Sequence, residues 1–317
     1  MRPNNRISTL DGWRGIAILI LLLAHSLAFN RISEHFPGGV FAVDLFFVIS
    51  GFIITARLLE EENVRGALPR FYLRRVFRIL PPVVLYLSTL SVISLVFPIV
   101  TASEVFASLF FYRNYQLSIH FYSNFTMHFW SLSVEEHFYL LWPAVLLLAG
   151  RKRALPVAIL CAIFCATWRV YDSPTSSLTR LFPAGTHQAF FRVIRTDQRL
   201  DGLLIGCVMA ILLSRIKIRN FIFRNFPKET PILCAFPLLL VLLRADGFPK
   251  LSIYVFIATA IASSLIIEDG LCYRLLNWLP LTWIGRISYS IYIWQQLFLF
   301  HFWKGLFAFR KWAPSTG

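Results

Sequence analysis

Two ionisable residues, Arg14 and His25, lie eleven positions apart in the apolar segment TLDGWRGIAILILLLAH near the N-terminus. Eleven residues make almost three turns of an α-helix, so both side chains share one face, with a rise of about 16 Å between them. This spacing predicts Arg14 near one membrane surface and His25 near mid-membrane. Ionisable residues at membrane depth are functional candidates, and histidine exchanges protons near neutral pH. The plainer alternatives are a surface anchor for Arg14 and a hydrogen-bonded core histidine for His25.

Two adjacent carboxylates, Glu135 and Glu136, lie inside the apolar stretch FWSLSVEEHFYLLWP, residues 129–143. A buried carboxylate is destabilising unless it is paired or protonated. Ser133 and Glu136 fit the capping box S-x-x-E, which predicts that a helix begins at Ser133 and gives Glu136 a structural role. Glu135 is turned about 100° from Glu136 on that helix. It has no such role, so it is the carboxylate that needs a functional explanation.

Four arginines gather in RFYLRRVFRILPP, residues 70–82. Arg70, Arg74 and Arg78 are spaced i, i+4, i+8, and Arg75 precedes Arg78 by three positions. On a helix this spacing places three or four guanidinium groups on one face. The planar guanidinium donates two parallel hydrogen bonds to a phosphate, so the pattern favours an anion-binding site. An anchor for lipid head groups is the alternative.

Other polar and aromatic residues stand near the ends of apolar segments. Asp44 lies near the expected outer end of GGVFAVDLFFVISGFIIT, and Arg199 and Asp201 begin the segment TDQRLDGLLIG, where a local ion pair would account for both. Tyr289 lies in WIGRISYSIYIWQQLFL, where an aromatic belt explains it about as well as substrate contact does. The candidates for contact with an acceptor substrate are Asp44, Asp201, Tyr289 and Trp130.

The elements that position these residues are membrane helices. The chain has 317 residues, of which 57% are hydrophobic and 15% are charged, whereas a soluble domain has about a quarter charged residues. Repeated apolar runs predict an all-α, polytopic transmembrane bundle of about 9–10 helices and not a β-barrel. The net charge of +15 is explained by basic loops on the inner side, so we expect an inside N-terminus and no nucleic-acid partner. The five cysteines include no CxxC pair, and we expect no metal site.

The apolar runs predict helices near the following residues: 13–30, 40–59, 80–98, 131–149, 154–170, 200–214, 231–243, 251–267 and 284–303. A further short or re-entrant helix is expected within residues 103–117.

In this order, six segments resemble the membrane acyltransferase-3 family, of the O-antigen and peptidoglycan O-acetylase type. They are LDGWRGIAILILLLAH, VDLFFVISGFIIT, FYLRRVFRILPP, FWSLSVEEHFYLLWP, RLDGLLIG and IGRISYSIYIW. The resemblance implies transfer of an acyl group from a cytoplasmic acyl-CoA to a hydroxyl of an extracytoplasmic glycan or glycolipid. It also implies that Arg14 and His25 are the paired first-helix residues, that Arg75 and Arg78 form the Arg-x2-Arg pair, and that Glu135 is the motif glutamate.

The sequence departs from the family pattern at two places. The last motif commonly reads Tyr-x-Trp-His, whereas here Trp294 is followed by Gln295 and Gln296. The family domain also usually has a further helix, and here the chain ends at Gly317. We therefore expect one integral-membrane acyltransferase domain over residues 1–317, with the last family helix missing.

The resulting hypothesis is an acyl-CoA-dependent O-acyltransferase, most simply an acetyltransferase, in a bacterial cytoplasmic membrane. Arg74, Arg75 and Arg78, with Arg14, would bind the phosphates of acetyl-CoA or another acyl-CoA. His25 would act as the general base or carry the acyl group, and Glu135 would contact and orient it.

Two alternatives stay open. A transporter or flippase for a lipid-linked or acylated glycan would also place ionisable residues at mid-membrane. Such a protein is typically built from two matching halves, and the sequence shows no such repeat. A non-catalytic relative of the enzymes is suggested by the two departures. The sequence leaves the acceptor, the acyl length and the oligomeric state open.

Overall fold

The computed structural model describes residues 7–29, 38–61, 64–116, 123–171, 194–234 and 250–299. Regular structure within these ranges is entirely helical, which confirms the all-α prediction. The elements are α1 (Ser8–Phe29), α2 (Gly38–Glu60), α3 (Val64–Ser94), α4 (Ala102–Leu109), α5 (Asn124–Met127), α6 (Phe129–Tyr171), α8 (Thr196–Leu213), α9 (Ile216–Asn225), α11 (Lys250–Ile266), α12 (Gly270–Leu276) and α13 (Leu279–Leu299).

The described residues contain four helical stretches long and apolar enough to cross a membrane: 8–26, 38–60, 66–94 and 124–171. A fifth candidate is the pair α11 and α12, which is bent by 93°. The stretch 124–171 contains both of the helices predicted at 131–149 and 154–170. They meet at Gly150, whose φ of 67° lies in the left-handed region that glycine adopts readily. Most of the helix predicted at 231–243 lies outside the described residues.

The helix predicted at 80–98 begins much earlier, at Val64, and ends at Ser94. The arginine cluster therefore lies within α3 itself and not in a loop before it. Leu73 and Phe77 of α3 are exposed apolar side chains. In a membrane protein they suit contact with lipid, and Arg75, about half a turn from Leu73, can face the bundle.

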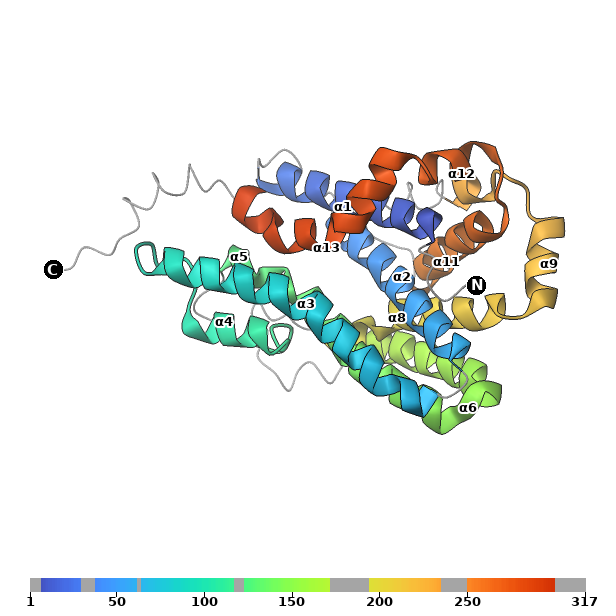
Figure 1. The fold of residues 1–317 in the computed structure, drawn as a ribbon, viewed down its shortest axis with the longest axis horizontal. Coiled ribbons are helices and arrows are strands. Elements are labelled where there is room, and N and C mark those ends of the chain that lie inside the picture. Colours follow the sequence, from blue (N-terminus) through green and yellow to red (C-terminus); the bar gives the residue numbers. More distant parts are fainter. Residues whose placement is uncertain are drawn as a thin grey trace.

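Small residues bring the central helices into direct backbone contact. A Cβ built at Gly51 of α2 would lie 1.9 Å from the carbonyl oxygen of Leu203 in α8, and one at Gly285 of α13 would lie 1.7 Å from that of Asp11 in α1. Such close approach is typical of packing between membrane helices. Figure 1 shows α13 beside α1, so the first and the last described helices pack together in one bundle. These contacts fix the height of each helix against its neighbour.

Candidate active site

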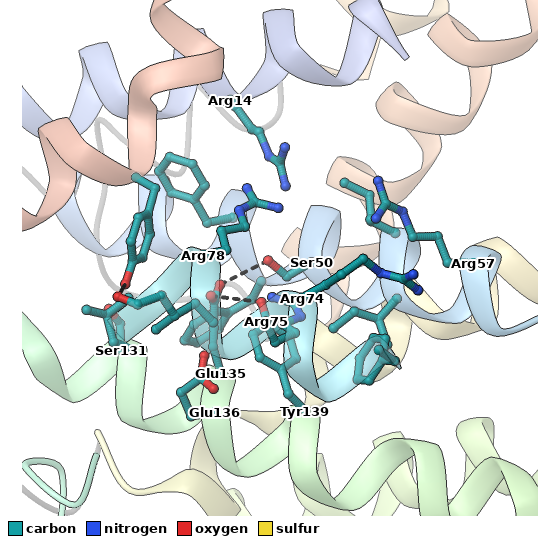
Figure 2. Close-up of a pocket in the computed structure, with 18 of the residues that line it drawn as sticks. Arg14, Ser50, Arg57, Arg74, Arg75, Arg78, Ser131, Glu135, Glu136 and Tyr139 are labelled. Carbon is teal, nitrogen blue, oxygen red and sulfur yellow. Dashed lines mark hydrogen bonds between the residues drawn. The ribbon is translucent and has the colours of Figure 1, made fainter. Parts of the chain in front are cut away.

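A cavity of about 380 Å³ opens between α1, α2, α3, α6 and α13. Five arginines from three helices line it: Arg14, Arg57, Arg74, Arg75 and Arg78. Figure 2 shows these side chains converging on one region from opposite walls. The structure thus brings together Arg14, Arg74, Arg75 and Arg78, as predicted, and adds Arg57 near the end of α2. Arg70, the first residue of the predicted series, is exposed and lies outside the lining.

The cavity is elongated along α2. Its lining residues on that helix and just beyond run from Val43 to Glu61, which corresponds to about 27 Å of helical rise. The arginines lie toward the Glu61 end, while Val43, Phe46 and Tyr292 contribute the opposite end. The cavity therefore has a strongly cationic end and a largely apolar end.

The positive charge of the cavity is poorly neutralised. Within the described part of the chain, Arg57, Arg74, Arg75 and Arg78 make no ion pair, and Arg14 approaches Asp11 only at 3.7 Å. The Arg75 guanidinium stacks on the ring of Tyr139, 3.5 Å from its centroid. The same cavity is lined by Glu61, Glu135 and Glu136, so five arginines face three carboxylates. The surplus of guanidinium groups favours a multiply charged anion.

Glu135 lies in the wall of this cavity, between the two ends. Its Oε1 accepts a hydrogen bond from Ser50 at 3.0 Å, and its Oε2 accepts one from Tyr139 at 2.9 Å. Figure 2 shows both contacts next to the arginines. Glu135 is therefore held by a serine of α2 and a tyrosine of its own helix.

The predicted contact between Glu135 and His25 is wrong, because the two residues lie at different heights in the bundle. A Cβ built at Gly39, near the start of α2, would lie 3.8 Å from His25 Nε2. Glu135 bonds instead to Ser50, eleven residues further along α2, which is about 16 Å of rise. His25 therefore lies near one end of the bundle and not at mid-depth. Its Nδ1 is 3.0 Å from Gln295 Oε1.

The comparisons with known proteins show the family of this chain. The sequence profile of a family described as an acyltransferase domain matches residues 7–316. The chain belongs to the acyltransferase-3 family. It is 29% identical to the peptidoglycan O-acetyltransferase OatA of Listeria monocytogenes, over 91% of this chain and 48% of that protein. It is 28% identical to a putative O-acetyltransferase of Staphylococcus aureus strain COL, over 91% of this chain and 50% of that protein.

An O-acetyltransferase OatA of Staphylococcus aureus strain NCTC 8325 is 27% identical, over 90% of this chain and 49% of the relative. The chain thus spans about half the length of the curated relatives it matches. No solved structure matches the chain significantly.

In this acyltransferase-family chain, the capping box predicted at Ser133 is absent. The helix α6 already begins at Phe129, and the Ser133 hydroxyl donates to the Phe129 carbonyl at 2.9 Å, as a serine does inside a helix. Its start is preceded by the short helix α5 and His128, which the apolar pattern did not reveal. Glu136, freed from the capping role, lines the cavity beside Glu135.

Two of the predicted acceptor contacts, Asp44 and Asp201, form buried ion pairs away from the arginine cavity. Asp44 accepts hydrogen bonds from Arg199 at 3.2 Å and from the Tyr254 hydroxyl at 3.1 Å. Asp201 pairs with Arg169 of α6. The local pair expected between Arg199 and Asp201 is therefore wrong, because each residue reaches across to another helix. These pairs tie α8 to α2 and α6, and an acceptor contact stays a prediction.

The other two predicted acceptor contacts, Tyr289 and Trp130, lie in different surroundings from each other. Tyr289 lines the cavity, and its hydroxyl donates to the Ile79 carbonyl of α3 at 3.1 Å. Trp130 is only 8% exposed and packs edge-on against Phe47, with the Arg199 guanidinium 5.3 Å from its ring centroid. Trp130 thus belongs to the interhelical packing.

Sequence reasoning missed His128. This buried residue directly precedes α6, and its Nε2 lies 3.1 Å from the Ile293 carbonyl of α13. The Tyr292 hydroxyl donates to the His128 carbonyl at 2.9 Å. The only sequence signal was a histidine immediately before FWSLSVEE, and its connection to α13 depends on the tertiary structure.

Proposed function

We propose that this chain is the membrane-embedded transfer domain of an O-acyltransferase that uses acetyl-CoA as its donor. The observation that carries the proposal is the arginine cavity in a chain of the acyltransferase-3 family. Its relatives are named O-acetyltransferases, which favours an acetyl group.

The shape of the cavity supports an acyl-CoA donor. The phosphates of coenzyme A would bind at the arginine end, where Arg75 and Arg78 offer paired hydrogen-bond donors on one face of α3. The uncharged pantetheine arm would run along α2 past Ser50 toward Val43. Val43 lies one helical turn from Gly39, which contacts His25, so the thioester would approach His25.

The distribution of basic residues supports a direction for the transfer. Besides the cavity arginines, Arg151 lies at the same end of the bundle, because its guanidinium donates to the Glu61 carbonyl. Basic residues concentrate on the cytoplasmic side of inner-membrane proteins. The arginine end would therefore face the cytoplasm, with the N-terminus, and His25 would lie toward the extracytoplasmic surface of a bacterial cytoplasmic membrane.

In the proposed reaction, His25 acts as a general base. It takes the proton of an acceptor hydroxyl as the hydroxyl oxygen attacks the thioester carbonyl carbon. A new C–O ester bond forms, the C–S bond breaks, and the departing thiolate takes the proton from His25. Neutral histidine suits this role because its unprotonated ring nitrogen can accept a proton. A hydroxyl of an extracytoplasmic glycan is the proposed acceptor, since one relative is named a peptidoglycan O-acetyltransferase.

The role of Glu135 in this proposal differs from the role predicted from the sequence, which was to orient His25. It lies beside Ser50 and Tyr139 in the cavity, so it would act on the donor and not on His25. The stacking of Arg75 on Tyr139, which bonds to Glu135, gives Glu135 a means to position Arg75 against the donor phosphates.

Replacing His25 with alanine tests the proposal. The purified protein in lipid nanodiscs would be given radiolabelled acetyl-CoA and soluble peptidoglycan glycan strands. We expect His25→Ala to lower transfer by about 10² to 10⁴-fold, as loss of a general base does, with the affinity for coenzyme A unchanged. The matched control is His137→Ala, because His137 bonds to Thr196 of α8 and lies outside the cavity lining.

Each alternative function gives a different outcome in the same assay. Full transfer by His25→Ala would overturn the base mechanism. Coenzyme A binding by the unaltered protein without any transfer would indicate a non-catalytic relative. Movement of a lipid-linked glycan across the bilayer, with neither binding nor transfer, would indicate a transporter.

A further inference from the structure

The end of α13 approaches His25 with two consecutive glutamines, Gln295 and Gln296. His25 Nδ1 lies 3.0 Å from Gln295 Oε1 and 3.5 Å from Gln296 Nε2. Gln295 is 3% exposed and Gln296 is 5% exposed. The position of α13 against α1 is fixed elsewhere by the backbone contact between Gly285 and Asp11, so these contacts form between two firmly packed helices.

The shorter contact determines which ring nitrogen of His25 carries the proton. An amide oxygen accepts hydrogen bonds and cannot donate one. In the tautomer that makes the 3.0 Å contact a hydrogen bond, Nδ1–H donates to Gln295 Oε1 and Nε2 is the basic nitrogen. The Gln296 amide nitrogen at 3.5 Å is itself a donor and forms no hydrogen bond with Nδ1 in that tautomer. Nε2 faces Gly39 at the start of α2, one turn from the end of the arginine cavity. Gln295 thus turns the basic nitrogen of His25 toward the cavity end.

The two glutamines also carry polar atoms that nothing in the described chain satisfies. Gln295 Nε2 and Gln296 Oε1 are buried and make no hydrogen bond with any described residue. One is a donor and the other is an acceptor, and both belong to side chains that reach His25 Nδ1. Buried polar atoms are usually hydrogen-bonded. A hydroxyl oxygen can accept from Gln295 Nε2, and a second hydroxyl can donate to Gln296 Oε1, so neighbouring hydroxyl groups of a glycan have the chemistry to satisfy both.

We infer that Gln295 is a positioning residue for His25, and that Gln295 and Gln296 together bind neighbouring hydroxyl groups of the acceptor glycan. The inference rests on the proposed function and deepens it. Gln295 Oε1 would keep its hydrogen bond to Nδ1–H while Nε2 takes the proton of the hydroxyl whose oxygen accepts from Gln295 Nε2. Gln296 Oε1 would accept from a neighbouring hydroxyl of the glycan. The family commonly has histidine after the motif tryptophan, where this chain has Gln295. The role proposed for Gln295 needs only an oxygen that accepts the hydrogen bond from Nδ1–H.

Two substitutions of Gln295 separate positioning from structural support. Gln295→Glu keeps an oxygen acceptor for Nδ1–H in a side chain of nearly the same shape. Gln295→Met keeps the length but removes the acceptor. A carboxylate is costly inside a membrane helix, whereas methionine is not. We therefore expect the Met variant to be at least as stable to heat as the Glu variant.

Activity should follow the opposite order. With labelled acetyl-CoA and glycan strands, we expect Gln295→Met to lower kcat by roughly 10- to 100-fold, as loss of an orienting partner does, with KM for acetyl-CoA unchanged. Gln295→Glu should keep more activity than Gln295→Met despite its lower stability. If activity instead follows stability, or if Gln295→Met has the kcat of the unaltered protein, the positioning role is overturned.

Gln296→Met tests the hydroxyl site. It removes one acceptor, so KM for the glycan strands should rise several-fold while KM for acetyl-CoA stays constant; unchanged KM values for both substrates would overturn the site. The matched control is Gln116→Met, because Gln116 is a buried amide bonded to Arg113 and Ser103 in another part of the chain. It should lower stability and leave both KM values unchanged.

A different result would overturn the proposed function itself, namely full activity of His25→Ala. An inactive His25→Ala together with a fully active Gln295→Met would leave that function standing and overturn only this inference.

Discussion

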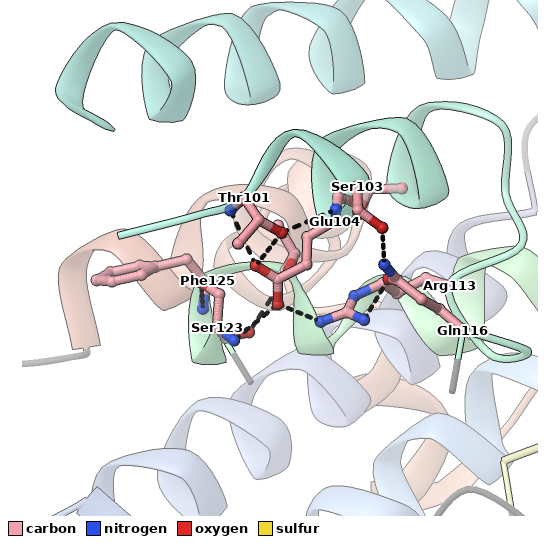
Figure 3. Close-up of polar contacts among 9 residues, drawn as sticks. Thr101, Ser103, Glu104, Arg113, Gln116, Ser123 and Phe125 are labelled. Atoms are coloured by element: carbon pink, nitrogen blue, oxygen red, sulfur yellow. Dashed lines mark hydrogen bonds and ion pairs between the residues drawn. The ribbon is translucent and has the colours of Figure 1, made fainter. Parts of the chain in front are cut away.

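The segment around Glu104 and the arginine cavity both place arginine near glutamate, yet only in the first do the two side chains form an ion pair. The Glu104 carboxylate accepts four hydrogen bonds, from Arg113 at 2.8 Å, from the Ser123 N–H at 2.8 Å, and from the N–H and hydroxyl of Thr101 at 3.0 and 3.1 Å. Figure 3 shows this closed network between α4 and the start of α5. The side chains of Glu104 and Arg113 are each 1% exposed.

The arginine cavity has the opposite arrangement. Its Glu135 is held by two neutral hydroxyl groups, and Arg57, Arg74, Arg75 and Arg78 pair with no carboxylate in the described chain. Charged side chains that lack an ion pair are costly in a membrane domain, so such a cluster is expected to serve a ligand. A charge satisfied by the chain stabilises the fold, whereas a charge left facing a cavity is available to a substrate.

The largest expected effect is on donor binding. Arg75→Gln combined with Arg78→Gln should remove at least two charge-assisted hydrogen bonds, worth about 3 kcal/mol or more together, and raise the Kd for coenzyme A by roughly 100-fold or more. The thermal midpoint should stay constant or rise, because removing two positive charges relieves repulsion among the cavity arginines. Equilibrium binding of coenzyme A and a thermal unfolding scan measure the two quantities. A large fall in the thermal midpoint with an unchanged Kd would show that the cavity arginines stabilise the fold, as Arg113 does, and do not bind coenzyme A.

Glu104→Gln should show the reverse pattern. Breaking a buried ion pair costs about 3 kcal/mol or slightly more, because Arg113 loses its carboxylate partner. We expect a markedly lower thermal midpoint and an unchanged Kd for coenzyme A in the folded protein. If the variant is as stable as the unaltered protein, the Glu104 network does not hold this segment.

Thr101→Val gives a smaller change within the same network. Thr101 caps α4, and its side chain accepts from the Glu104 N–H while Glu104 reaches back to the Thr101 N–H. Loss of this capping box should destabilise the protein by about 1 kcal/mol, less than Glu104→Gln does. Thermal unfolding scans of Thr101→Val and Glu104→Gln rank the two losses of stability. A larger loss for Thr101→Val would show that the ion pair stabilises the segment less than the capping box does.

Much of the site follows from periodicity along single helices. The spacing of Arg74, Arg75 and Arg78 placed their guanidinium groups on one face of α3, and the structure turns that face into the cavity. Arg14 and His25 share a helix, so the rise per residue already separated them by almost three turns. Such relations within a helix depend only on its regular geometry.

The partners of Glu135 and His25 needed the tertiary structure. The hypothesis from the sequence placed the two residues in contact, but a contact depends on the relative heights of α1, α2 and α6. Each residue of displacement moves a side chain about 1.5 Å along the axis and about 100° around it. Close glycine contacts such as Gly51 against Leu203 fix these heights, and an apolar pattern does not specify them.

The sequence by itself determined that this protein is a membrane-embedded helical bundle, that it belongs with the acyltransferase-3 motifs, and that its arginines share one helical face. Hydropathy, helical period and motif order are properties of the chain alone. Only the tertiary structure decided that Glu135 bonds to Ser50 and Tyr139, that Glu136 lines the cavity, and that His25 meets Gln295. These contacts join helices distant in sequence, and the packing of those helices sets which side chains lie at the same depth.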